Sequence, residues 1–474
     1  MNDKNLIARK EECHVLERCY KSNEPELVII YGRRRVGKTF LITEFFEDNF
    51  AFRITGVYKK PKATQLSNFT YELNKKSGKE YECFETWSEA FRALRAYLDT
   101  LPKNKKQVVF FDETPWLDTQ KSDFLPSFDF FWNNYANSKN NLMFIVAGSA
   151  SAWITNKLIE NKGGFFNRHT ARLYLEPFTL KETKEYLVRK GIHWNDYDIA
   201  QTYMVTGGIP FYLKQFDEDE TVSENIDRIY FKKNGPLWDE FSRLYDTLFN
   251  GDQKYQDIVE ALAKSRRGMK REEISKSAGV PKNGTLTKML RNLIDSGFVS
   301  EIESHSERKT TLYVLTDFYT IFYFDFLKEN YGKEEHFWTI TTDLPKRKAW
   351  LGLTFELLCK NHISQIKKKL GIEGISSTYY SWERQGNEYV DGCQIDLVID
   401  RRDNVADLCE IKFSTGTFAI SKDYDENLRN KFSRFSDEYP RKSIQMVLIT
   451  TYGLAKGMYA NTINKVVTLK DFFE

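Results

Sequence analysis

The sequence predicts an α/β protein of several domains, and three observations lead to this fold class. The chain has 474 residues, which at roughly 100–200 residues per domain corresponds to about two to four domains. In the N-terminal third, short apolar runs alternate with amphipathic segments of helical period. A glycine-containing loop joins the first apolar run to the segment after it, as expected where a buried strand leads into a helix through a tight turn.

The composition excludes several other classes of protein. The chain carries 70 Lys and Arg against 67 Asp and Glu, a formal net charge of +3, so any nucleic-acid-binding surface must be local. Hydrophobic residues make up 41% and aromatic residues 15%, which excludes wholesale disorder. The six cysteines form no CxxC pair, and the sequence shows no signal peptide and no apolar stretch near ~20 residues. We therefore expect a soluble cytoplasmic protein with reduced thiols and no membrane partner.

Four apolar runs in the N-terminal part predict a parallel sheet. Runs of about four to eight apolar residues bounded by turn residues are typical of strands that are buried on both faces. Helical segments such as 38–49 and 87–101 lie between the runs, and this alternation indicates helices on both faces of the sheet. We assign residues 1–176 to this domain. The runs are 26–32, 107–113, 142–149 and 172–178.

The loop after the first strand predicts a nucleotide site, because it fits the pattern GxxxxGK[ST] at every position. Its glycines let successive N–H groups face one phosphate cluster, and the helix that follows directs its positive end there. Lys38 is expected to reach the β- and γ-phosphates, and the Thr39 hydroxyl to bind Mg²⁺. A glycine turn with an incidental lysine is the alternative. We expect a P-loop with ATP and Mg²⁺ as cofactors, formed by Gly32, Arg33, Arg34, Arg35, Val36, Gly37, Lys38 and Thr39.

Polar side chains are expected at the same edge of this sheet. The run 107–113 ends in Asp112 and Glu113, and the run 142–149 ends in Ser149. Asp112 would hold Mg²⁺ and Glu113 would polarise the attacking water, whereas a solvated acidic strand end is the alternative. Ser149 would contact the γ-phosphate or the water as a sensor, and a helix N-cap is the rival interpretation.

The segment after the sheet predicts an arginine for catalysis and then a helical region. Arg168 is a candidate arginine finger for the leaving phosphate, and Arg172 is a weaker candidate. A plain surface arginine is the alternative. The pattern becomes helical over residues 177–240, and GGIP at 207–210 interrupts it as a turn signal.

Residues 241–330 are expected to contain a winged helix-turn-helix, because three short helical patterns precede a two-stranded hairpin. The stretch 264–291 holds nine basic residues and only two acidic ones, which gives a near-neutral chain a local positive patch. An interdomain spacer or a protein contact is the alternative to DNA binding. At the start of the expected recognition helix, where major-groove readers place their contacts, lie Lys282, Thr285, Thr287 and Lys288.

The C-terminal residues 331–474 are expected to form a separate α/β domain with a carboxylate–lysine site. A turn-like RRDN separates the run that holds Asp396 from the run that holds Glu410 and Lys412, so the two runs are interpreted as a hairpin. Period-two alternation places Glu410 and Lys412 on the same face of their strand. If Asp396 points to that side, two carboxylates and an ammonium group converge.

Such a site suits metal-assisted phosphodiester cleavage, because Mg²⁺ prefers oxygen ligands. Asp396 and Glu410 would hold the ion, and Glu356 on the preceding helix is a further candidate ligand. Lys412 would help to deprotonate or position the attacking water. The alternative is a charged strand edge with an ion pair. His362 is expected on the surface of its helix rather than in the site.

The stretches YGRRRVGKTFLI, FFDETPWL, VAGSAS and GGIPFYL resemble a prokaryotic family of STAND-like ATPases of the AAA superfamily. The similarity covers nearly the whole chain. The resemblance implies a P-loop NTPase parallel sheet with a helical lid, a winged helix-turn-helix and a C-terminal restriction-endonuclease-like α/β domain of the PD-(D/E)XK type. It also implies adenine contacts near Ile7–Arg9 and at Pro210. The segment 161–169 is less regular than the arginine segment of that family, which leaves the finger open.

Together, these features predict an ATP-hydrolysing protein that engages DNA and has a Mg²⁺-dependent nuclease activity in its C-terminal domain. One alternative is a switch in which the nucleotide controls conformation and the C-terminal domain only binds nucleic acid or protein. Another is a toxin-like or defence effector that needs a trigger. Both an oligomer and a monomer are compatible with the sequence.

Overall fold

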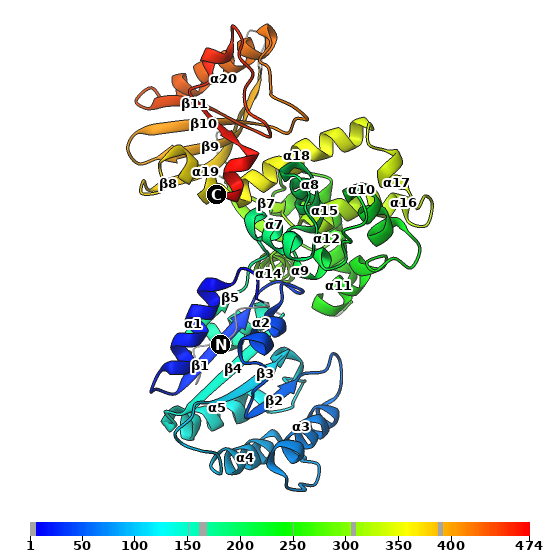
Figure 1. Ribbon diagram of the computed structural model, residues 1–474, viewed down its shortest axis with the longest axis vertical. Helices are drawn as coiled ribbons and strands as arrows, with labels where there is room; N and C mark the ends of the chain where they lie inside the picture. The colour runs from blue at the N-terminus through cyan, green and yellow to red at the C-terminus, as the bar shows by residue number, and fades with distance from the viewer. Residues whose placement is uncertain (1–5, 150, 161–167, 250, 305–309, 387–391) are drawn as a thin grey trace. The chain divides into compact units, whose positions relative to one another are not determined.

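The computed structural model describes residues 6–149, 151–160, 168–249, 251–304, 310–386 and 392–474 (Figure 1). The chain divides into two compact units. The first comprises Met1–Pro177, Arg243–Gly251 and Arg291–Gly297, and the second comprises Phe178–Ser242, Asp252–Leu290 and Phe298–Glu474. Within the described residues, none of the helices has the length and apolar character needed to cross a membrane.

The first unit is built on the parallel sheet that the sequence predicts. Its five strands lie in the order β2-β3-β4-β1-β5, and all neighbours are parallel. The sequence interpretation missed β2, an edge strand of four residues. The strands are β1 (Glu26–Tyr31), β2 (Phe52–Thr55), β3 (Gln107–Asp112), β4 (Leu142–Gly148) and β5 (Ala171–Tyr174).

One face of this sheet carries an aromatic core. Phe111 of β3 contacts Phe144 of β4 with ring centroids 4.8 Å apart, and Phe69 and Phe128 from helices pack on the same side. The fully buried Trp87 begins α4 behind a capping box of Thr86 and Glu89. The α-helices in the N-terminal part of this unit are α1 (Lys10–Lys21), α2 (Lys38–Phe45), α3 (Lys62–Ser77), α4 (Trp87–Leu98), α5 (Phe124–Asn134) and α6 (Ser151–Ile154).

Helices and one hairpin occupy the chain between the two sheets. The strands β6 (Val299–Ser304) and β7 (Thr310–Leu315) pair antiparallel after three short helices, α12 (Gln253–Ala263), α13 (Arg271–Ala278) and α14 (Gly284–Asp295). This is the element order that the sequence predicts there. The other helices are α7 (Leu180–Arg189), α8 (Asp196–Thr206), α9 (Pro210–Leu213), α10 (Val222–Ile226), α11 (Glu240–Phe249), α15 (Phe318–Phe322), α16 (Lys328–Asn330) and α17 (Phe337–Ile340).

The C-terminal part of the second unit contains a mixed sheet of five strands in the order β12-β11-β10-β9-β8. The pairs β8–β9 and β9–β10 are antiparallel, whereas β10–β11 and β11–β12 are parallel. Leu428 and Phe435 of α20 pack on one face of the sheet. The elements are α18 (Pro345–Asn361), α19 (Ile363–Leu370), β8 (Ser377–Arg384), β9 (Cys393–Arg401), β10 (Val405–Lys412), α20 (Lys422–Glu438), β11 (Ser443–Thr450) and β12 (Lys465–Thr468).

The expectation that His362 lies on a helix surface is wrong. Helix α18 ends at Asn361 and α19 begins at Ile363, so His362 lies between the two helices, and its side chain is buried. Its Nε2 accepts the Leu180 N–H at 2.9 Å, and its Nδ1 lies 2.9 Å from the Leu358 carbonyl oxygen. Burial lowers the pKa of His362 to about 4. This histidine therefore joins α18 to the start of α7 as a neutral structural residue.

Candidate functional site

The loop between β1 and α2 is curled at three positions. Gly32, Arg35 and Gly37 have φ values of 140°, 74° and 93°. A Cβ at Gly32 would lie 2.4 Å from the Leu175 carbonyl oxygen, so a side chain there would displace the backbone that follows β5. Glycine is required at this point because two backbone segments approach closely.

Lys38 lies inside this curl. Its side chain is buried, and its Nζ donates to the carbonyl oxygens of Gly32 and Arg33, each at 3.0 Å. Burial lowers the pKa of Lys38 to about 8. A buried ammonium group that donates to carbonyl oxygens of its own loop can take an anionic phosphate as a further partner.

A second pair of side chains offers oxygen atoms next to the loop. Thr39 Oγ1 donates to Asp112 Oδ2 at 2.8 Å. Asp112 ends β3 and is buried, and this burial raises its pKa. A hydroxyl and a buried carboxylate are ligands that suit Mg²⁺. A bound cation would also favour the ionised form of this carboxylate.

The neighbouring carboxylate has a different partner. Glu113 adopts a left-handed conformation with φ of 43°, and Ser149 Oγ lies 3.0 and 2.9 Å from its two carboxylate oxygens. The Ser149 N–H donates to the same carboxylate at 3.4 Å. Because β3 and β4 are adjacent and parallel, their carboxyl ends bring the two residues together. Ser149 therefore orients Glu113, a contact that the sequence interpretation did not include.

Arg9 is a further residue at the loop. Its guanidinium group is buried and donates through Nη2 to the carbonyl oxygens of Val36 at 3.2 Å and Glu176 at 2.8 Å. It thereby ties the curled loop to the segment after β5. The family resemblance implies an adenine contact near Ile7–Arg9. The residue pattern does not indicate that Arg9 bonds the Val36 and Glu176 carbonyl oxygens.

The remaining residues predicted to contact the nucleotide are Arg168, Arg172, Pro210 and the loop arginines. Arg168 is exposed just before β5, and Arg172 is exposed on β5. Residues 161–167 of the predicted arginine segment lie outside the described residues. Pro210 is the first residue of α9 in the second unit. Its contact with adenine, like the finger role of Arg168, stays a prediction. Of the loop arginines, Arg33 is buried, while Arg34 and Arg35 are half-buried.

The C-terminal carboxylate–lysine residues gather around Glu410 of β10. Glu410 Oε1 accepts from the Tyr424 hydroxyl at 2.6 Å and pairs with Lys412 Nζ at 2.9 Å. Its Oε2 accepts from Lys431 Nζ at 2.7 Å. Asp396 of β9 accepts the Ile411 N–H at 3.2 Å through Oδ2. Tyr424 and Lys431 were missed because they lie on α20, far along the chain from the strand motif.

Burial and neighbouring charges shift the pKa values of the three carboxylates and of Lys412 in different directions. Burial, followed by the neighbouring Asp396, raises the pKa of Glu356 to about 7, and burial together with Glu410 raises the pKa of Asp396. Burial also favours protonated Glu410, but Lys412 and Lys431 outweigh it and lower the pKa of Glu410. Burial disfavours charged Lys412, yet the carboxylates, Glu410 first, outweigh that effect and raise its pKa. Lys412 is therefore an ammonium group rather than a base.

The predicted metal ligands Asp396, Glu410 and Glu356 do not form a ready metal cage. Across the described ranges, no group of three or more His, Cys, Asp or Glu side chains is arranged to hold a metal ion. The physical reason is that two ammonium groups and a phenol already occupy the oxygens of Glu410. Binding of Mg²⁺ here would bring a cation next to two ammonium groups that already neutralise Glu410, and the metal assignment stays a prediction.

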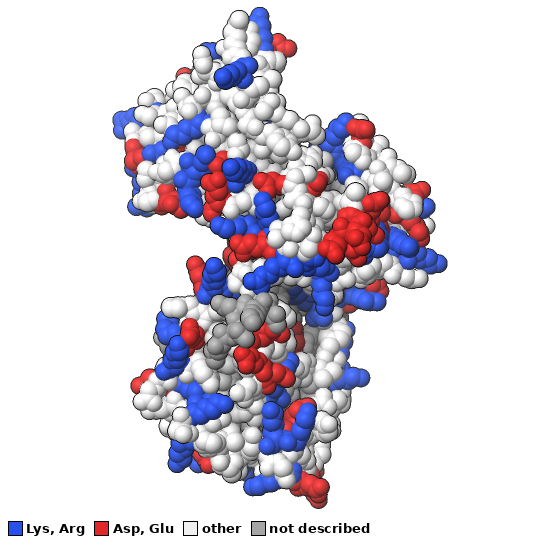
Figure 2. All heavy atoms as spheres, in the orientation of Figure 1, with Lys and Arg blue, Asp and Glu red and all other residues white. Residues whose placement is uncertain are grey.

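The predicted DNA-contacting side chains are all exposed. Thr285, Thr287 and Lys288 lie in the first turns of α14, and Lys282 precedes this helix and forms an ion pair with Glu272. Figure 2 shows Lys and Arg side chains gathered where α14 lies in Figure 1. Such a surface can meet phosphates, but no base preference follows from it.

Comparison with known proteins identifies the N-terminal region. Residues 6–216 match the model of a family described as an ATPase domain predominantly from Archaea. An uncharacterized protein of Methanocaldococcus jannaschii is 25% identical over 414 residues, which cover 86% of this chain and 87% of that protein. An uncharacterized ATP-binding protein of the same organism is 55% identical over 43 residues, which cover 9% of this chain and 73% of that protein.

Among solved structures, a Walker-type ATPase of Pyrococcus abyssi is similar with a TM-score of 0.45 and 18% identity. The similarity covers 68% of this chain and 96% of that chain. From the matched family model and the curated relatives, the chain belongs to the P-loop ATPases, and residues 6–216 hold its archaeal-type ATPase domain.

Proposed function

We propose that this protein hydrolyses ATP at the loop between β1 and α2, engages DNA through its second unit, and cleaves phosphodiester bonds at the Glu410 site. The observation that supports ATP hydrolysis is that two adjacent carboxylates have different hydrogen-bond partners. Asp112 is paired with Thr39, and Glu113 is held by Ser149. Neighbouring carboxylates with different partners can take different roles in one reaction.

In this mechanism, Lys38 binds the β- and γ-phosphates, and Thr39 and Asp112 would hold Mg²⁺. When bound, Mg²⁺ would neutralise charge on the phosphate oxygens. Glu113 orients the attacking water and accepts its proton, while the Ser149 hydroxyl fixes the direction of the Glu113 carboxylate. Arg9 keeps the loop curled through its bond to the Val36 carbonyl oxygen.

The DNA part of the proposal is supported by charge and chemistry in the second unit. Lys282 and Lys288 are exposed at the start of α14, where they can contact phosphates. Glu410 and Asp396 lie on neighbouring strands with Lys412, which is the donor set that Mg²⁺-dependent cleavage uses. Because Lys412 is charged, it positions water or stabilises the phosphate and does not take the proton.

A second candidate function has a specific observation in its favour. Glu410 is bonded by Tyr424, Lys412 and Lys431 together. A carboxylate neutralised by two ammonium groups can serve as a structural link as well as a metal ligand. In that case the second unit binds nucleic acid or protein without cleavage, and ATP turnover acts as a switch.

Incubating pure protein with plasmid DNA, Mg²⁺ and ATP tests both candidates. We expect Lys38→Ala to abolish ATP turnover, and Lys412→Ala to abolish nicking while ATP turnover persists. Lys422→Ala, an exposed lysine of α20, is the matched control and should leave both unchanged. Nicking that persists in Lys412→Ala would remove Lys412 from the mechanism. Intact plasmid across divalent metals, together with ATP turnover, would favour the switch.

A further inference from the structure

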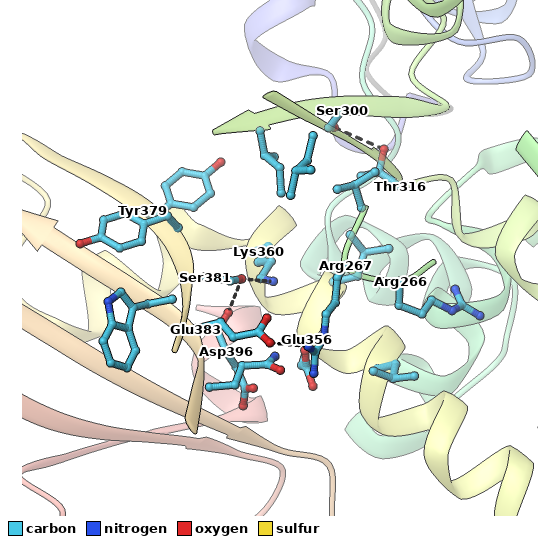
Figure 3. A pocket seen from close by; sticks show the side chains of 18 of the residues that line it. Arg266, Arg267, Ser300, Thr316, Glu356, Lys360, Tyr379, Ser381, Glu383 and Asp396 are labelled. Atoms are coloured by element: carbon cyan, nitrogen blue, oxygen red, sulfur yellow. Dashed lines mark hydrogen bonds and ion pairs between the residues drawn. The ribbon is translucent and has the colours of Figure 1, made fainter. Parts of the chain in front are cut away.

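A single cleft of the second unit contains the Glu410 site and part of the β6–β7 hairpin. Its lining includes Asp396, Glu410 and Glu356 on one side and residues of β6 and β7 on the other. Strand β8 and helix α18 complete the walls (Figure 3). The cleft has a volume of about 1250 Å³. A ligand that fills this cleft therefore contacts both the carboxylates and the hairpin.

The size of the cleft limits what can enter it. Pockets for drug-sized ligands are ~300–1,000 Å³, so this volume accommodates a few nucleotides of one strand. A turn of double helix is ~34 Å long, and its major groove alone is ~12 Å wide. Such an object does not fit between the hairpin and β8 without a large movement of one of them.

The exposed apolar side chains of the cleft match unpaired bases. Tyr379 of β8 is 49% exposed, Leu353 of α18 is 42% exposed, and Ile302 of β6 is 40% exposed, although all three are large and hydrophobic. In Figure 3 the Tyr379 ring lies at the cleft on the strand that also carries Ser381 and Glu383. An exposed aromatic ring beside a cleft is the platform on which bases of a single strand stack.

The charged groups of the cleft suit a phosphate backbone. Arg267 extends across the cleft and pairs with Glu383 at 2.7 Å, with both side chains largely exposed (Figure 3). Exposed ion pairs of this kind are weak and exchange readily, so a phosphate can replace Glu383 as the partner of Arg267. Lys360 donates to the Ser381 hydroxyl at 2.9 Å, and this hydroxyl donates to the backbone carbonyl oxygen of Asp396, so Lys360 offers a second cation beside β9.

We propose that this cleft binds single-stranded DNA, with a base stacked on Tyr379 and the backbone held by Arg267 and Lys360. The inference rests on the proposed engagement of DNA and adds the strand state to it. The lining holds six acidic and five basic residues. The basic residues nearly balance the acidic ones, so the cleft as a whole repels a phosphate backbone only weakly.

Fluorescence anisotropy of the full-length protein tests this proposal. The probes are a fluorescein-labelled oligodeoxynucleotide of mixed sequence, its blunt duplex and the RNA of the same sequence, each with Ca²⁺ in place of Mg²⁺. We expect the single strand to bind about tenfold more tightly than the duplex, and Tyr379→Ala to weaken single-strand binding about tenfold. Tyr379→Phe should bind as the wild type does. Tyr71→Ala, which removes an exposed tyrosine of α3, is the matched control.

The outcomes separate this inference from the proposed function. Tighter binding of the duplex, or a Tyr379→Ala variant that binds the single strand like the wild type, would overturn the cleft proposal. Duplex nicking that depends on Lys412 would at the same time leave the proposed function standing. Preference for the RNA strand would replace DNA as the ligand and overturn the proposal as stated. Absence of binding to any probe by protein that still turns over ATP would refute the cleft proposal and the proposed engagement of DNA, and would leave the proposed ATP hydrolysis standing.

Discussion

Replacement of Ser149 by alanine is the sharpest test of the ATPase geometry. The Ser149 hydroxyl has one proton, and it lies within 3.0 Å of both carboxylate oxygens of Glu113, so the substitution removes one hydrogen bond to a charged group. Such a bond contributes about 1.5–3 kcal/mol. If all of it is needed to orient Glu113 in the transition state, the turnover number for ATP falls by about ten- to a hundredfold, because ~1.4 kcal/mol corresponds to a factor of ten.

The assay is steady-state ATP hydrolysis by Ser149→Ala, Glu113→Gln and the double variant. If Ser149 acts only through Glu113, adding Ser149→Ala to Glu113→Gln has almost no further effect on the turnover number. Nucleotide affinity should change little in Ser149→Ala, since Lys38 and Thr39 are untouched. Losses that simply add in the double variant would refute the reasoning and would favour direct contact of Ser149 with the γ-phosphate.

Three further predictions concern other contacts. Arg9→Ala removes the bond to the Val36 carbonyl oxygen and should weaken ATP binding about tenfold in a calorimetric titration; unchanged affinity would exclude the clamp. The raised pKa of Glu356 means that the folded state binds more protons than the unfolded state between about pH 4.5 and 7, so stability falls as pH rises through that window. Glu356→Gln should therefore gain stability over the wild type from about pH 5 to about pH 8 in urea unfolding, by about 3 kcal/mol at most; a constant difference would contradict the raised pKa. Lys431→Met leaves Glu410 with one ammonium partner and should destabilise the protein by about 3 kcal/mol, with partial recovery when Glu410→Gln is added, as thermal unfolding can measure.

The parallel sheet and its nucleotide loop were predictable because their determinants are local. A buried parallel strand is a continuous apolar run, and GxxxxGK[ST] specifies a backbone conformation through glycines that only a few positions separate. The antiparallel pairing of the strands that hold Asp396 and Glu410 was predictable for the same reason, since a short turn joins them. Strand β2 was missed, although β5, the edge strand of equal length, was covered by a predicted run.

The amino-acid sequence alone determined which chemical groups this protein has and on which local elements they lie: the curled loop with Lys38, the strand ends with Asp112 and Glu113, and the strand with Glu410. Only the tertiary structure decided their partners. Ser149 lies 36 positions from Glu113, and Lys431 lies 21 positions from Glu410. Contacts over such separations depend on how strands and helices pack, and no local pattern of residues encodes them. Because the partners of a carboxylate limit which way it points, tertiary packing fixed the direction of Glu113 and of Glu410.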